Sequence, residues 1–207
     1  MSRKIGIMGG TFNPIHTGHL ILGESAATEL GLDLVLYMPA GNPPHKTIKN
    51  AVRDEERVDM VRLAIAANEH FALSLHDMNQ DGYCYTYRML EELKAQHPED
   101  ELYFIMGADS LFDFDTWLKP ERIAAACRLV VAIRNHAEAE AFKEAIRHVE
   151  TAYQADIRVL TTPNIDISSH EIRRKVSEKR SIRYYVPDSV RQYILDHQLY
   201  LDDENED

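Results

Sequence analysis

The sequence predicts a doubly wound α/β fold, in which helices cover a mainly parallel sheet. Short apolar runs rich in Val, Ile, Leu, Tyr and Phe alternate with longer amphipathic stretches. Several runs are apolar on both faces, as buried parallel strands are. The alternation is typical of strands joined by helical crossovers, so a ligand site is expected at the carboxyl ends of the strands, beside the topological switch point.

The expected elements follow one another along the chain with short connections. Strands are expected at 4–8, 34–39, 71–75, 102–107, 129–133 and 157–161. Helices are expected at 18–30, 53–68, 85–97, 120–126, 137–149, 169–178 and 187–197. Gly31 is a typical helix end, and Pro187 is expected in the first turn of the last helix. Ser168 followed by Glu171 is a capping-box signature at the start of the helix before it.

Three segments describe the organisation of the chain. Residues 1–165 form the expected α/β core, and residues 166–201 form a small helical C-terminal subdomain packed on the sheet. Residues 202–207, DDENED, form a solvated acidic tail. The 207-residue length suits one domain with a small appendage.

Composition narrows the class of protein. A net charge of −11 argues against non-specific binding to nucleic acid or to an anionic membrane surface. The two cysteines, Cys84 and Cys127, lack CxxC spacing and are expected as reduced, buried thiols. Because the sequence has neither an apolar leader pattern nor an 18-residue apolar run, a soluble cytoplasmic protein is expected. A homodimer is one assembly that the sequence allows.

The stretch GGTFNPIHTGHL follows the first strand and has the features of an anion-binding turn. It matches neither the dinucleotide fingerprint nor the Walker loop. Gly9 and Gly10 let the backbone approach a ligand closely, and a helix that starts near Thr17 points free N–H groups at an anion. His16 and His19 then flank that anion as donors. Two alternatives are capping histidines and a metal site, but no third ligand is spaced to join a metal.

Weaker signals lie at the ends of other strands. In PPHK, two prolines hold Lys46, and with it His45, on the edge where the opening turn lies. Asp109 either holds ribose hydroxyls or caps a helix. Trp117, the only tryptophan, is either a buried core residue or a stacking platform for a ring. Thr86 lies among aromatic residues in a segment that says little by itself.

ISSHEIR, residues 167–173, is the second strong signal. It opens a helix with two adjacent serines, Ser168 and Ser169, and places Arg173 within the first two turns. A local positive patch in so acidic a protein indicates a polyphosphate ligand, whereas the basic residues from Arg174 onward fit a solvated helix face.

These motifs together resemble the nucleotidyltransferases that carry HxGH and ISSxxxR-type motifs, and more narrowly the bacterial nicotinate-nucleotide adenylyltransferases. PPHK, GYCYTYRML, MGADSL with Trp117, and YYVPDSVRQYILDHQLY follow in that family's order, so the resemblance spans about residues 3–201. It implies a Rossmann-like domain with a helical C-terminal part that completes the ATP site. It also implies transfer of the adenylyl group of ATP to nicotinate mononucleotide, giving deamido-NAD and pyrophosphate.

The resemblance also implies roles for individual residues. His16 and His19 would contact the ATP phosphates, and Gly9, Gly10, Thr11 and Phe12 would form the cleft floor. Ile167, Ser168, Ser169 and Arg173 would line the adenosine and phosphate side, with Lys46 and Arg173 among the catalytic groups. His45 and Lys46 would approach the phosphates, Asp109 a ribose, and Thr86 and Trp117 the nicotinate ring. Mg²⁺ would be held largely by the ATP phosphates and water. Because a phosphate monoester is already a nucleophile at neutral pH, direct transfer without a covalent enzyme intermediate is expected.

Two departures from the family pattern bear on the substrate. Arg134-Asn135-His136 stands where many relatives have Arg-Pro-Gly, so Arg134 is only a weak phosphate candidate. Tyr87-Arg88-Met89-Leu90 replaces a common x-Asp-Thr-Leu and bears on recognition of the pyridine ring. Three alternative hypotheses for the function are a phosphopantetheine or cytidylyl transferase, an adenylyltransferase that prefers nicotinamide mononucleotide, and a non-catalytic nucleotide sensor.

Overall fold

The computed structural model describes residues 2–41, 52–79, 85–132, 139–163 and 165–201. Its centre is a six-stranded sheet in which every neighbouring pair is parallel, in the order β3-β2-β1-β4-β5-β6. The strands are β1 (Lys4–Gly10), β2 (Leu34–Pro39), β3 (Phe71–Leu73), β4 (Glu101–Gly107), β5 (Arg128–Ala132) and β6 (Ile157–Leu160). The chain moves outward from β1 to β3 and then returns to the other side of β1, so the switch point lies between β1 and β4.

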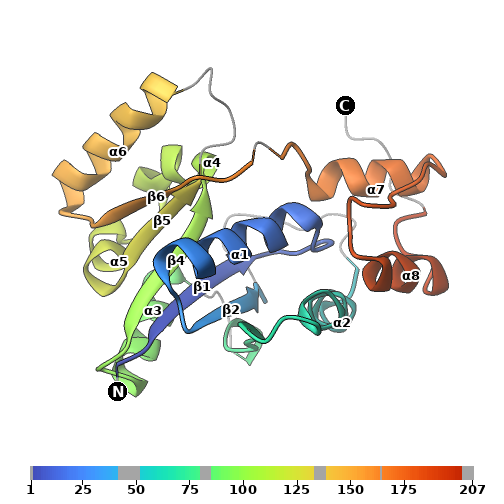
Figure 1. Cartoon of the computed structure of the whole chain (residues 1–207), viewed down its shortest axis with the longest axis horizontal. Coiled ribbons are helices and arrows are strands. Elements are labelled where there is room, and N and C mark those ends of the chain that lie inside the picture. The colour runs from blue at the N-terminus through green and yellow to red at the C-terminus, as the bar shows by residue number, and fades with distance from the viewer. Residues whose placement is uncertain (1, 42–51, 80–84, 133–138, 164, 202–207) are drawn as a thin grey trace.

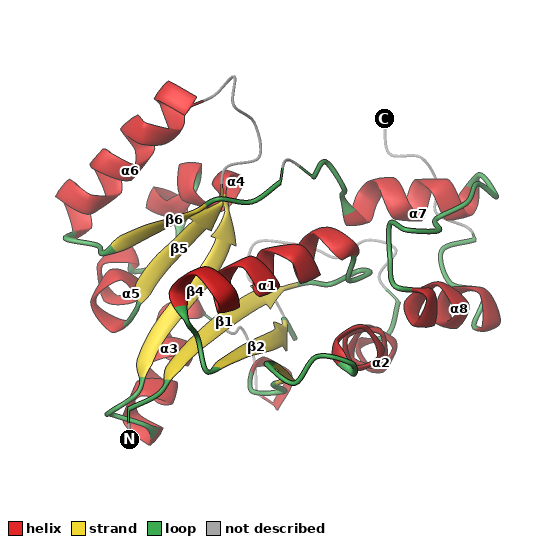
Figure 2. Ribbon diagram, in the orientation of Figure 1, coloured by secondary structure: helices red, strands yellow, loops and turns green. Residues whose placement is uncertain are grey.

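Helices cover both faces of the sheet (Figure 2). They are α1 (Thr17–Leu30), α2 (Asp54–Ile65), α3 (Thr86–Gln96), α4 (Ala108–Phe112), α5 (Pro120–Ala126), α6 (Ala139–Tyr153), α7 (Ser169–Ser177) and α8 (Asp188–Asp196). Two short 3₁₀ turns, η1 (Asp77–Asn79) and η2 (Phe114–Thr116), lie in the connections. The predicted doubly wound α/β fold is confirmed, with each expected strand and helix present near its predicted bounds.

Alternate residues of each central strand enter two separate hydrophobic clusters. On β4, Tyr103 and Ile105 pack toward α1, α2, α7 and α8, whereas Phe104 and Met106 pack toward α3, α5 and α6. A strand that is apolar on both faces is buried on both faces, which explains the continuous apolar runs in the sequence. The C-terminal helices contribute to the first cluster and have no separate core, since Ile172 and Ile194 pack there.

The local end signals behave mostly as predicted. Gly31 ends α1 in the left-handed conformation, with φ of 59°. Ser168 caps α7 by accepting the Glu171 N–H at 3.1 Å, whereas the Glu171 carboxylate pairs with Lys175 at 3.3 Å. Pro187 was expected in the first turn of α8, but it lies one position earlier, as the N-cap of this helix.

Three short elements were not predicted, and one alternative was wrong. α4, η1 and η2 are each one turn long and carry no helical periodicity. Gly107, not Asp109, occupies the N-cap of α4, so the capping alternative for Asp109 is excluded. Burial raises the pKa of the Cys127 thiol to about 12, as expected for a buried reduced cysteine, while Cys84 lies outside the described residues. In the described part of the chain, none of the helices has the length and apolarity needed to cross a membrane.

Candidate active site

The candidate site lies where β1 ends and α1 begins, at the carboxyl edge of the sheet. α7 and α8 lie beside this end of β1, whereas the N-terminus lies at its other end (Figure 1). The positive end of the α1 dipole points into this site, and the first turn of the helix contains no acidic residue. This combination favours an anion.

His16 and His19 form a stacked pair at the start of α1. Their ring centroids lie 3.7 Å apart with an interplanar angle of 29°. His16 is the N-cap of the helix, and its backbone N–H donates to Nδ1 of His19 at 3.2 Å. Because Nδ1 of His19 is an acceptor, the proton of the neutral ring lies on Nε2. His19 therefore presents Nε2–H as a donor, and it is only partly buried.

ISSHEIR contacts the loop before α1 directly. The Ser169 hydroxyl donates to the Pro14 carbonyl at 2.8 Å, and Nη1 of Arg173 donates to the Asn13 carbonyl at 3.0 Å. These bonds span more than 150 positions of the chain. They fix the backbone just before His16, and the structure thereby brings the two strongest sequence motifs together.

Three tyrosines near the C-terminus also form hydrogen bonds to the loop before α1 and to its first residue. The Tyr200 hydroxyl donates to Oδ1 of Asn13 at 2.9 Å, and both residues are buried. The Tyr185 carbonyl accepts the Thr17 N–H at 2.9 Å, and the Tyr184 carbonyl accepts the Thr17 hydroxyl at 3.1 Å. One N–H at the start of α1 is thus satisfied by the C-terminal segment.

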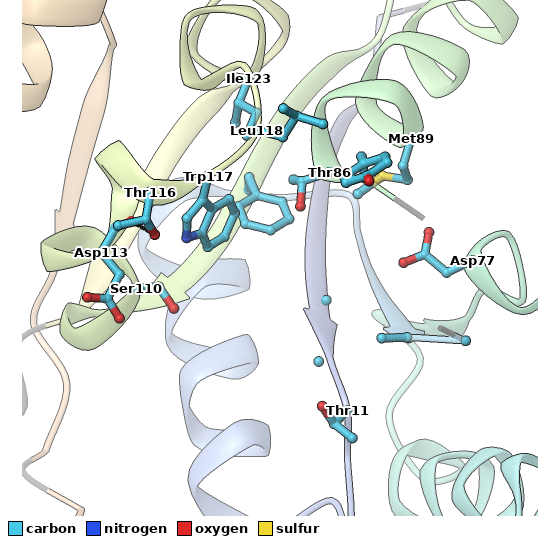
Figure 3. Close-up of a pocket in the computed structure, with 16 residues that line it drawn as sticks. Thr11, Asp77, Thr86, Met89, Ser110, Asp113, Thr116, Trp117, Leu118 and Ile123 are labelled. Atoms are coloured by element: carbon cyan, nitrogen blue, oxygen red, sulfur yellow. Dashed lines mark hydrogen bonds between the residues drawn. The ribbon is translucent and has the colours of Figure 1, made fainter. Parts of the chain in front are cut away.

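A cavity of about 390 Å³ opens beside the end of β1 (Figure 3). This volume is within the range of small-molecule sites. Its lining residues are Gly9, Gly10, Thr11, Ala40, Gly41, Asp77, Tyr85, Thr86, Met89, Phe104, Ser110, Asp113, Thr116, Trp117, Leu118 and Ile123. In Figure 3, Trp117, Leu118 and Ile123 form an apolar end, while Ser110, Asp113 and Thr116 form a polar wall. The cavity therefore suits a ligand with a flat ring and polar substituents.

Other aromatic rings pack against Trp117 at the apolar end of this cavity. The Trp117 ring lies edge-on to Phe104, with centroids 5.9 Å apart, and 5.7 Å from the buried Phe114 ring. Thr86 is the first residue of α3, whose first turn carries no acidic residue. The positive end of the α3 dipole therefore faces the same space as the indole.

A narrower crevice, of about 40 Å³, borders the other part of the loop. It is lined by His16, Gly18, Ile21, Leu22, Gly107, Ala132, Thr162, Pro163, Ile165 and Ile167. The loop from Gly9 to Gly18 thus borders two hollows, one next to Trp117 and one next to Ile167.

Several candidate residues occupy other positions. Phe12 belongs to this loop and has a left-handed backbone conformation, with φ of 49°. Its ring is buried in the hydrophobic cluster, 5.0 Å from the ring of His19. Asp109 is exposed in the first turn of α4. His45, Lys46 and Arg134 lie outside the described residues.

Among the residues of this site that sequence reasoning missed is the fully buried Arg57. Its guanidinium donates from Nη1 to the Thr11 carbonyl at 2.6 Å and from Nη2 to the Ala40 carbonyl at 2.8 Å. Arg57 is also paired with Asp54 on α2 at 2.6 Å. It connects the ends of β1 and β2, where both backbones line the larger cavity. In the sequence it is one charge among many in RDEERVDM, and nothing there marks it as buried.

Comparison with known proteins defines the family. A model described as cytidylyltransferase-like matches residues 7–175. A probable nicotinate-nucleotide adenylyltransferase of Lachnoclostridium phytofermentans is 39% identical over 96% of this chain and 100% of its own length. One of Thermomicrobium roseum is 44% identical over 95% of this chain and 91% of its own length. The chain belongs to the nicotinate-nucleotide adenylyltransferase family.

A solved structure supports the fold of this adenylyltransferase. The nicotinic acid mononucleotide adenylyltransferase of Plasmodium falciparum, complexed with NaAD, superposes with a TM-score of 0.77 at 20% identity, covering 98% of each chain. The resemblance given by HxGH and ISSxxxR is confirmed at the level of the family. The narrower relationship also separates the adenylyltransferase from the phosphopantetheine and cytidylyl transferases considered above.

The described part of the adenylyltransferase contains no group of three or more His, Cys, Asp or Glu side chains arranged to hold a metal ion. The donors at the phosphate side are imidazoles and backbone N–H groups, which suit anions. Mg²⁺ prefers oxygen ligands and keeps several waters. The site therefore fits a metal that arrives bound to a polyphosphate.

Proposed function

We propose that this adenylyltransferase joins ATP to nicotinate mononucleotide, forming nicotinate adenine dinucleotide (deamido-NAD) and pyrophosphate. The observation that carries the proposal is the single loop, Gly9–Gly18, which borders both hollows and presents a stacked histidine pair. An enzyme that joins two nucleotides needs two adjacent sites and positive groups where their phosphates meet. Family membership supports the same reaction.

In the proposed mechanism, a phosphate oxygen of the mononucleotide attacks the α-phosphorus of ATP in line. The bond between the α-phosphorus and the bridging oxygen to the β-phosphate breaks, and its electron pair leaves with pyrophosphate. No general base is required, because a phosphate monoester with a second pKa near 6 is largely dianionic at neutral pH. The protein must instead bring two anions together and stabilise the charge.

The residues at the start of α1 are suited to that task. His19 would donate Nε2–H to a nonbridging phosphate oxygen, and His16 together with the α1 N–H groups would add positive potential. Arg173, held against the loop through Asn13, would place its charge on the same side. A divalent metal, which we propose is Mg²⁺, would neutralise the triphosphate charge while bound mainly to its oxygens. Lys46, His45 and Arg134 stay predictions for phosphate binding.

The larger cavity is suited to the mononucleotide. Trp117 would contact the pyridine ring, and the positive end of α3 at Thr86 would favour a nicotinate carboxylate over an uncharged carboxamide. Gly9, Gly10 and Thr11 would let its ribose phosphate approach the backbone. Ile167, Ser168 and Ser169 would border the adenosine side, and Asp109 stays a prediction for a ribose. The proposed substrates and the buried reduced Cys127 fit a cytoplasmic enzyme.

The test is pyrophosphate release with Mg-ATP and each pyridine mononucleotide separately. We expect release with nicotinate mononucleotide at a kcat/KM about fivefold or more above that with nicotinamide mononucleotide, the size of a helix-dipole effect. The reverse order would overturn the substrate assignment. ATP binding without turnover of either acceptor would favour the nucleotide sensor, and light scattering of the same preparation would test for a homodimer.

A further inference from the structure

Gly23 lies buried in the middle of α1, where glycine needs a physical reason. Inside a helix glycine is less favourable than alanine by a factor of about five in the equilibrium constant. The neighbouring buried positions of this helix, Ala26 and Ala27, carry alanine. Some structural demand therefore excludes a methyl group from position 23.

That demand comes from Tyr37 on β2. A Cβ atom at position 23 would lie 2.2 Å from the Tyr37 hydroxyl oxygen and 3.1 Å from its Cζ. The first distance is far below any real contact, and the residue is fully buried, so the tyrosine has no room to move aside. Glycine at position 23 makes space for one oxygen atom.

The hydroxyl in that space donates to the backbone carbonyl of His19 at 3.2 Å. In an α-helix the same carbonyl accepts the N–H of residue 23, four positions later. The N–H of Gly23 and the Tyr37 hydroxyl therefore both donate to the His19 carbonyl. This shared acceptor explains why a Cβ at position 23 would collide with the hydroxyl oxygen. Burial raises the pKa of Tyr37 well above its ordinary value, so the hydroxyl keeps its proton and remains a donor.

A second contact connects Tyr37 with the ring of His19. Phe12 lies between them, with its ring centroid 6.0 Å from Tyr37 and 5.0 Å edge-on from His19. Tyr37 thus supports both the backbone of His19, through its hydroxyl, and the imidazole, through Phe12. The carbonyl bond is the only part of this support that depends on one oxygen atom.

We infer that Tyr37 is a positioning residue for adenylyl transfer, because its hydroxyl holds His19 in place through the His19 carbonyl. Glycine is required at position 23 because it leaves room for that hydroxyl. The inference rests on the role proposed for His19. A misplacement of about 1 Å in a reacting group can cost 100-fold in rate, so a small shift of α1 is sufficient to matter.

The test is a double-mutant cycle of Gly23→Ala, Tyr37→Phe and the combination. Gly23→Ala should lower kcat about tenfold or more, because the methyl group displaces the hydroxyl and with it the first turns of α1. Tyr37→Phe should lower kcat by about three- to tenfold, as expected for the loss of one neutral hydrogen bond. With phenylalanine at position 37, the nearest atoms to a Cβ at 23 are the Cζ atoms of residue 37, at 3.1 Å, and of Phe71, at 3.3 Å. Shifts of a few tenths of an ångström relieve both contacts, so the double variant should recover to nearly the kcat of Tyr37→Phe.

Unfolding by urea supplies a readout that does not depend on the reaction. In the wild-type background, Gly23→Ala should increase the equilibrium constant of unfolding. In the Tyr37→Phe background, the same substitution should increase that constant by a factor at least about tenfold smaller. The matched control is Tyr103→Phe, which removes a hydroxyl from a similarly buried tyrosine near the amino end of β4, where it contacts Glu101 and Arg128. Its kcat should stay within about twofold of the wild type.

Three results would overturn the inference. They are a kcat in the double variant that is lowered by the product of the two single effects, an unchanged kcat in Tyr37→Phe, and a Gly23→Ala variant that loses stability but keeps its kcat. Failure of the proposed function gives a different result, since no variant or wild type would then release pyrophosphate. In that case the unfolding cycle and the imidazole NMR resonances of His19 still test the contact. Resonances that do not move in Gly23→Ala and Tyr37→Phe would overturn it.

Discussion

Replacing Arg57 by methionine should destabilise the protein and weaken mononucleotide binding. The side chain is fully buried, and its guanidinium satisfies the carbonyls of Thr11 and Ala40. Methionine has a similar length but no donor, so the carbonyls of the partly buried Thr11 and Ala40 lose hydrogen bonds to a charged group, which contribute about 1.5–3 kcal/mol each. The variant no longer desolvates a cation, which offsets part of this loss. We therefore expect a decrease of about 2–3 kcal/mol in the free energy of unfolding.

A second arginine on the same helix provides the matched control. Arg62 pairs with Asp59 three residues earlier, as Arg57 pairs with Asp54, but the Arg62 side chain is 57% exposed. Arg62→Met should change the stability by less than about 1 kcal/mol, because exposed ion pairs contribute little. Both variants are compared by urea unfolding monitored by circular dichroism. Equal effects of the two substitutions would refute the argument from burial.

The same variant has a kinetic consequence. Thr11 and Ala40 both line the larger cavity, so releasing their carbonyls loosens its floor. KM for the mononucleotide should rise more than KM for ATP in Arg57→Met, measured at a temperature where the variant is folded. An equal rise in both constants would mean that Arg57 stabilises the fold without shaping the cavity.

Three further predictions concern other contacts. His19→Ala should lower kcat about 100-fold, as for other donors to a transition state, and steady-state pyrophosphate release would measure it. Ser169→Ala removes the bond to the Pro14 carbonyl, so the midpoint of urea unfolding should fall by an amount equivalent to about 1 kcal/mol; an unchanged midpoint would show that water replaces the hydroxyl. The Arg3 guanidinium lowers the pKa of Asp100, so its contribution is complete above the unfolded-state pKa of about 3.9 and is lost as pH falls through the lower folded-state value. Asp100→Asn should therefore flatten the acid side of the stability profile, and an unchanged slope would contradict this linkage.

The strands and the two end motifs were predictable because their signals are local. A run such as LYFIMG is apolar on both faces only if both faces are buried, and Gly31 ends a helix through its own backbone conformation. HxGH and ISSxxxR combine several residue types in short segments, so each motif is specific without any knowledge of contacts. α4, η1 and η2 could not be found in this way, because one turn is too short to show a period.

The supports of the site were not predictable, because they depend on burial and on backbone atoms. Arg57 occupies a helix with many charges, and only the fold reveals that it faces the ends of two strands. The carbonyls of Tyr184 and Tyr185 act on Thr17 through groups that every residue has. Gly23 is visible in the sequence, but its partner on β2 is defined by tertiary packing.

These supports imply that the loop from Gly9 to Gly18 cannot take its shape without the C-terminal segment. Asn13, Pro14 and Thr17 obtain hydrogen bonds from residues between Ser169 and Tyr200. The same segment completes the hydrophobic cluster on one face of the sheet and has no core of its own. A loop of this kind, with polar backbone groups buried beside an apolar cluster, is costly unless every group is paired. The histidine pair should therefore become ordered only when α7 and α8 have packed, so that folding of residues 169–201 and formation of the candidate site are one event.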